Sequence, residues 1–100
     1  MRKNEILKVI RENREKIKEF GVKRIGIFGS FARDEAGEES DIDIIVEFDL
    51  EGLTFDKYLA FEEFLKSLFS KKVDIITKDG LETIRIEHIK NEIKKSIIYA

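Results

Sequence analysis

The sequence predicts an α/β (α+β) fold in which helices flank one small mixed β-sheet. Short β-prone runs at residues 22–28, 42–48 and 72–77 are separated by segments whose apolar residues recur at helical spacing. Because strands and helices alternate along the chain, one sheet covered by helices is the expected architecture. The connection between the first two strands is short, so the pattern leaves their relative direction open.

The helices are marked by apolar residues three or four positions apart. The first is expected over about residues 4–20, with Gly21 as its C-terminal cap. Further helices are expected within residues 29–36 (a turn and a short helix), at 55–68 and at 86–97. The pair Asp79-Gly80 predicts a turn between the third strand and the last helix.

Length and composition limit the possible classes of protein. With 100 residues, the chain is expected to form a single domain over residues 1–100. A net charge of −2 is too balanced for a typical nucleic-acid-binding protein, so no direct contact with nucleic acid is expected. The absence of cysteine excludes disulfides and thiolate metal sites. No apolar run is long enough to span a membrane and the first residues lack a signal-peptide pattern, so we expect a cytoplasmic protein.

Asp41 and Asp43 lie one residue apart at the start of the second strand. Side chains alternate along a strand, so both carboxylates should point to one face while Ile42 and Ile44 point to the core. Neighbouring carboxylates repel each other, and hard cations such as Mg²⁺ bind carboxylate oxygens. The pair therefore predicts a metal site; the alternative is a strand start with a solvated outer face.

Gly29 and Ser30 follow the first strand, where the chain turns into a short helix. A glycine lets the backbone approach a ligand closely, and N–H groups at helix starts bind phosphate. The stretch is not a P-loop, since the Gly-Lys-Ser/Thr ending is missing. A phosphate-binding turn facing an acidic pair suits a nucleoside triphosphate with Mg²⁺.

Asp74 occupies the middle of the third strand, where a charged side chain costs stability unless it is solvated or paired. It could lie on an edge strand and simply contact water. It could also share a face with Asp41 and Asp43, and three carboxylates could then hold two metal ions.

These residues together resemble the minimal nucleotidyltransferase (MNT) family of the DNA polymerase β-like superfamily. The resemblance rests on Gly29-Ser30, Phe31-Ala32-Arg33, Ser40-Asp41-Ile42-Asp43 and Asp74, and it extends over nearly the whole chain. It implies the polymerase β-like nucleotidyltransferase fold and transfer of a nucleotide from a nucleoside triphosphate to a hydroxyl.

The resemblance also implies roles for individual residues. Asp41, Asp43 and Asp74 would bind two Mg²⁺ ions and serve as the catalytic carboxylates, while Gly29 and Ser30 would hold the triphosphate of ATP. Arg33 matches an Ala-Arg pair of the family and would contact phosphate, although it could equally be a surface arginine. Family members often carry glycine after this arginine, where this chain has Asp34. The loop is therefore where the conformation of this chain could differ from that of the family.

Small members of the family commonly accompany a HEPN-domain ribonuclease toxin and act as antitoxins, and some transfer AMP to a tyrosine of the toxin. The resemblance therefore implies a protein adenylyltransferase whose partner supplies the acceptor hydroxyl. A second hypothesis is an antitoxin that neutralises its partner by binding alone. A third is an α/β domain whose carboxylates are coincidental; the presence of three aspartates favours the first hypothesis.

Overall fold

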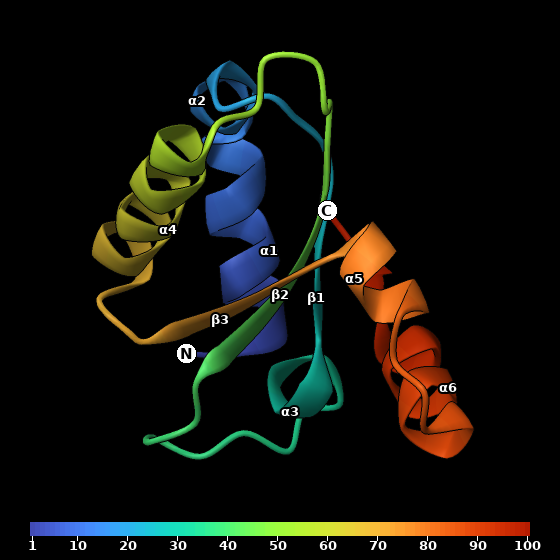
Figure 1. Ribbon diagram of the computed structural model, residues 1–100. Coiled ribbons are helices and arrows are strands. Elements are labelled where there is room, and N and C mark those ends of the chain that lie inside the picture. Colours follow the sequence, from blue (N-terminus) through green and yellow to red (C-terminus); the bar gives the residue numbers. More distant parts are fainter.

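A computed structural model describes residues 1–100 as a four-stranded sheet with helices on both faces (Figure 1). The elements in chain order are α1 (Lys3–Glu12), α2 (Arg14–Glu19), β1 (Val22–Phe28), α3 (Gly29–Ala32), β2 (Ile42–Phe48), α4 (Phe55–Phe69), β3 (Val73–Thr77), α5 (Lys78–Glu82), α6 (Glu87–Ser96) and β4 (Ile98–Tyr99). Helices α1, α2 and α4 cover one face of the sheet, whereas α5 and α6 lie on the other.

The sheet is mixed, as the alternation of elements predicted. Its strand order is β3-β2-β1-β4. Strand β1 pairs antiparallel with β2 and with β4, and β2 pairs parallel with β3. The structure thus fixes the strand direction that the sequence left open. The expected boundaries of β1 and β2 are confirmed, and β3 begins one residue later than expected, at Val73.

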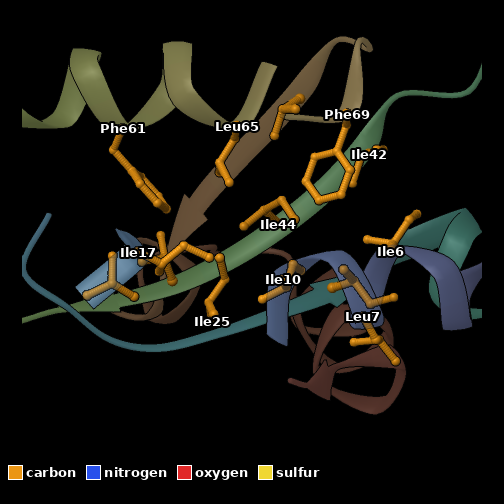
Figure 2. Packing of buried hydrophobic residues seen from close by; sticks show 14 of the residues in the cluster. Ile6, Leu7, Ile10, Ile17, Ile25, Ile42, Ile44, Phe61, Leu65 and Phe69 are labelled. Atoms are coloured by element: carbon orange, nitrogen blue, oxygen red, sulfur yellow. The ribbon is translucent and has the colours of Figure 1, made fainter. Parts of the chain in front are cut away.

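One hydrophobic cluster of 17 buried residues fills the space between the sheet and helices α1, α2 and α4 (Figure 2). The alternate residues of β2 that were expected to face the core are buried: Ile42, Ile44, Val46 and Phe48. Phe61 and Leu65 of α4 pack into the same cluster and are fully buried. This cluster holds β2 rigidly, and so it fixes the strand that carries Asp43.

The single helix expected over residues 4–20 is wrong, because the chain forms two helices that meet at Asn13. The Asn13 backbone has φ −108° and ψ 18°, outside the helical range. Its side-chain Nδ2 donates to the Val9 carbonyl oxygen at 2.8 Å. Asparagine side chains compete in this way for the backbone bonds that would continue a helix. Gly21 ends the second of the two helices with φ 84°, a conformation that favours glycine.

Three expectations near the other loops also need correction. The short helix after Gly29 ends at Ala32 and does not extend to residue 36. The turn expected at Asp79-Gly80 is the short helix α5, whose first turn is capped by the Thr77 hydroxyl, which accepts the Gly80 N–H at 2.9 Å. The last helix ends at Ser96, and Ile97 is extended.

Strand β4 follows that extended residue and was not expected from the sequence. It pairs Tyr99 with Gly26 and Ile98 with Ile27 of β1. Gly26 permits this close pairing, because a Cβ atom there would lie 2.6 Å from the Ile98 carbonyl oxygen. The pairing secures the end of α6 beside β1.

Replacing Gly26 with alanine is expected to push β4 off the sheet and to destabilise the protein by about 1–3 kcal/mol, the usual cost of overpacking. Chemical denaturation would measure the loss, and hydrogen exchange at the Ala100 amide, which donates to the Ile25 oxygen at 2.9 Å, would report on β4. Gly37→Ala is the control, since no atom lies within 4 Å of a Cβ built at Gly37. Unchanged protection at Ala100 in Gly26→Ala would contradict the prediction.

No helix of the structure is both long enough and apolar enough to cross a membrane.

Candidate functional site

The predicted site residues gather where β1 ends and β2 and β3 begin. Asp43 of β2 pairs with Phe28, the last residue of β1, and with Asp74 of β3. Registered residues of neighbouring strands present their side chains to the same face. The expectation that Asp74 shares a face with Asp43 is therefore confirmed, and Asp41 lies just ahead of β2.

Asp43 is the electrostatic centre of this group. It is half-buried, and burial raises the pKa of its carboxyl, as do the negative charges of Asp74 and Asp41. The Arg33 guanidinium acts in the opposite direction on the same pKa. Asp74 and Asp41 are thus close enough to Asp43 to repel its carboxylate, and a cation beside Asp43 would relieve that repulsion.

Gly29 forms the turn directly beside Asp43. Its φ is 71°, in the left-handed region that glycine adopts without strain. A Cβ atom added at Gly29 would collide with the Oδ2 atom of Asp43. The Gly-Ser turn therefore packs its backbone against the Asp43 carboxylate, as the proposed pairing of a phosphate turn with an acidic site requires.

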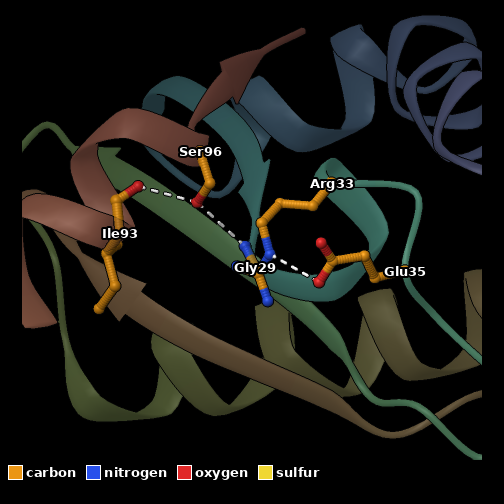
Figure 3. A network of polar contacts seen from close by, with 5 residues as sticks. All are labelled: Gly29, Arg33, Glu35, Ile93 and Ser96. Carbon is orange, nitrogen blue, oxygen red and sulfur yellow. Dashed lines mark hydrogen bonds and ion pairs between the residues drawn. The ribbon is translucent and has the colours of Figure 1, made fainter.

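Ser96, at the end of α6, connects that helix to the turn (Figure 3). Its Oγ atom accepts the Gly29 N–H at 3.2 Å and donates to the Ile93 carbonyl oxygen at 2.9 Å. The two bonded residues are 67 positions apart, and no sequence pattern pointed to this contact. The Gly29 N–H is therefore already bonded within the protein, and α6 holds it in place.

Arg33 follows α3 and is exposed. Its Nε atom donates to the Glu35 carboxylate at 3.1 Å (Figure 3). Asp34, which stands where related proteins often have glycine, adopts a φ of 57° and forms an ion pair with Lys3 at 3.1 Å. Asp34 thus takes the left-handed conformation that glycine adopts most readily.

The strand face that carries the aspartates is only partly open to solvent, which corrects the expectation of a solvent face. Ile45 lies on the same face as Asp43 and is 1% exposed. Helix α5 contacts β2 and β3 and buries its own Leu81. Asp74 is exposed and β3 is an edge strand, so the solvated environment considered for Asp74 is also present.

The donor chemistry of the site fits Mg²⁺, although the side chains do not form a closed set of ligands. No three His, Asp or Glu side chains converge as a ready-made metal-binding group. Carboxylate oxygens are nevertheless the ligands that Mg²⁺ prefers, and it commonly binds one or two of them together with water and substrate phosphates. Two registered aspartates and the adjacent Asp41 supply such a partial set.

A four-stranded mixed sheet flanked by helices, with neighbouring aspartates beside a glycine turn, defines a class of α/β domain. The nucleotidyltransferase domain is a family of this class, and its profile matches residues 6–100. The chain belongs to this nucleotidyltransferase family.

Two curated relatives agree with this assignment. A candidate protein adenylyltransferase of Methanocaldococcus jannaschii is 41% identical over 98 residues, which cover 96% of this chain and 95% of the relative. The protein adenylyltransferase MntA of Thermococcus cleftensis is 39% identical over 80 residues, which cover 79% of this chain and 80% of the relative.

Solved structures share the fold. A candidate minimal nucleotidyltransferase superposes with a TM-score of 0.67 at 29% identity, over 92% of this chain and 93% of the other. A toxin–antitoxin structure with AMP-PNP gives a TM-score of 0.61 at 21% identity, over 99% of this chain and 72% of the other. The expected nucleotidyltransferase fold is therefore confirmed.

Proposed function

We propose that this protein transfers AMP from ATP to a hydroxyl of a partner protein, and that it acts in this way as the antitoxin of a HEPN-domain ribonuclease toxin. The observation that carries the proposal is the placement of Asp43 against the Gly29 turn, in register with Asp74 and close to Asp41. Support for the adenylyl group and for the toxin comes from relatives named as protein adenylyltransferases and from the toxin–antitoxin structure with AMP-PNP.

In the proposed reaction, the acceptor oxygen bonds to the α-phosphorus of ATP and the bond from that phosphorus to the bridging oxygen breaks. The electron pair of the broken bond leaves with pyrophosphate, and the acceptor proton passes to water. Asp41, Asp43 and Asp74 would hold Mg²⁺, which when bound would neutralise negative charge on the phosphates and lower the pKa of the attacking hydroxyl. The chain itself contributes position: the packed β2 strand and the Gly29 turn hold these groups in a fixed relation.

The experiment is incubation of the protein with Mg²⁺-ATP and its HEPN-domain partner, followed by intact-mass spectrometry. Wild-type protein should add AMP to the partner, and Asp41→Asn/Asp43→Asn should lower the rate on the order of a thousandfold, since a metal contributes several kcal/mol to such reactions. Asp56→Asn/Asp79→Asn is a matched control that removes the same charge from exposed helix starts. No AMP addition by the wild type, or equal addition by both double variants, would contradict the proposal.

The same variants separate catalysis from binding alone. If catalysis protects the cell, Asp41→Asn/Asp43→Asn should still bind the toxin in a pull-down yet fail to restore growth. Restored growth would instead support an antitoxin that acts by complex formation.

A further inference from the structure

A hollow lies between α3 and the last turn of α6, next to the Gly29 turn. Its lining residues are Arg33 from the end of α3 and Glu92, Lys95 and Ser96 from α6, and its volume is about 470 Å³. Ser96 is also the residue whose Oγ accepts the Gly29 N–H. Asp43 also packs against Gly29, so Gly29 contacts both Ser96 of the hollow and the Asp43 carboxylate.

Of the two cations of this hollow, Lys95 has no ion-pair partner and Arg33 is paired with Glu35 through its Nε atom. Lys95 forms no ion pair, although Glu92 lies one helical turn before it, whereas its neighbour Lys94 pairs with Glu82 at 2.8 Å. Lysines in the last turn of a helix ordinarily balance the helix dipole, and the partnered Lys94 already does so. Arg33 uses its Nε for Glu35, which leaves the remaining guanidinium N–H groups as donors.

We propose that this hollow binds the pyrophosphate end of the nucleoside triphosphate, with Lys95 and Arg33 as the binding cations and Ser96 as a positioning residue. The inference rests on the proposed function and adds α6 to the nucleotide site. When the α-phosphorus bond breaks, negative charge grows on the departing pyrophosphate, and two nearby cations stabilise it there. The bond from Gly29 to Ser96 keeps α6 at the right place for this contact.

A second hollow, lined by four cations and six apolar residues, allows charge alone to be compared with position as the cause of binding. It lies between α1, α2 and the edge of β1, has a volume of about 240 Å³, and is lined by Arg14, Lys18, Lys23 and Arg24 without any acidic residue. It carries more positive charge than the hollow beside α6, but it does not adjoin Gly29. Binding by charge alone would favour the α1–α2 hollow, whereas binding as part of the nucleotide site favours the hollow beside α6.

Calorimetry with ATP and AMP tests the proposal without any transfer reaction. Lys95→Ala should weaken ATP binding about tenfold and leave AMP binding unchanged, since a hydrogen bond to a charged group is lost only with the longer ligand. Lys94→Ala, one residue away, should change neither affinity. An ATP-to-AMP affinity ratio that is the same in Lys95→Ala and wild type would overturn the inference. Failure of the wild type to bind ATP at all would instead reject the proposed function.

Titration with inorganic pyrophosphate, followed by amide NMR shifts, locates the anion directly. The expected shifts are at Ser30, Lys95 and Ser96, and shifts confined to Lys18 and Arg24 would overturn the inference. The role of Ser96 is tested by two variants, measured at a temperature at which both are fully folded: Ser96→Ala should weaken ATP binding, and Ser96→Thr, which keeps the hydroxyl, should restore it. Equal ATP binding by all three proteins would exclude the positioning role.

Discussion

Gly29→Ala is expected to destabilise the protein by about 2–5 kcal/mol and to abolish nucleotide transfer. The estimate combines about 1–2 kcal/mol for a left-handed alanine with about 1–3 kcal/mol for forcing a new atom into a packed site. Both costs apply here, because Gly29 has φ 71° and its Cβ would collide with the Asp43 carboxylate. Equilibrium denaturation and the AMP-transfer assay measure the two effects.

Gly37→Ala again serves as the matched control, because it adds the same methyl group in open space. A double-mutant cycle with Asp43→Ala isolates the collision: removing the carboxylate should recover part of the stability that Gly29→Ala loses. If the two substitutions were simply additive, the turn would not be packed against Asp43 and the described site geometry would be wrong.

Asp43→Asn is expected to have opposite effects on activity and stability. Transfer should fall on the order of a thousandfold, since an amide is a poor ligand for a metal that stabilises the transition state. The metal-free protein should nevertheless melt at a higher temperature than wild type. At neutral pH burial disfavours the charged Asp43 carboxylate, and Asp74 and Asp41 repel it; the neutral amide removes both effects.

The pH dependence gives an independent check on this variant. The pKa of Asp43 is raised in the folded protein, so its protonated form stabilises the fold and that contribution is lost as the pH rises through the folded pKa. The stability advantage of Asp43→Asn in the presence of EDTA should therefore be largest at neutral pH and shrink as the pH falls. Thermal melts of both proteins across the acidic range would measure it, and a constant difference would contradict the assigned repulsion.

The sequence predicted the positions of the three main strands and the shared face of the aspartates. It did not predict β4, the contact of Ser96 or helix α5. Strand β2 is an apolar run, and the burial of Ile42, Ile44, Val46 and Phe48 follows from period-two alternation. Strand β1 does not alternate, because Lys23 and Arg24 are both exposed and residues 25–27 are all buried. The sequence places Asp43 and Asp74 at the same position relative to their apolar neighbours, whereas their register comes from the parallel pairing of β2 with β3, which no local pattern predicted. Local patterns of this kind depend only on neighbouring residues.

The missed features depend on contacts that local patterns do not encode. Strand β4 is two residues long, too short to show alternation, and it exists because Gly26 admits it to the sheet. Ser96 reaches the site through a contact between distant parts of the chain, and a serine at a helix end carries no distinguishing signal. The cap at Thr77 was visible as a threonine preceding a polar turn, and it would have predicted α5.

The position of Asp74 on an edge strand has a consequence for solubility. An exposed sheet edge is a template for pairing with another chain, and proteins protect such edges with short strands and charged side chains. Here one edge, β4, has two residues, and the other, β3, has five residues with an exposed aspartate in second place. The same carboxylate that is proposed to bind a metal thus also discourages edge-to-edge aggregation, so a substitution made to probe chemistry at Asp74 removes a safeguard against self-association.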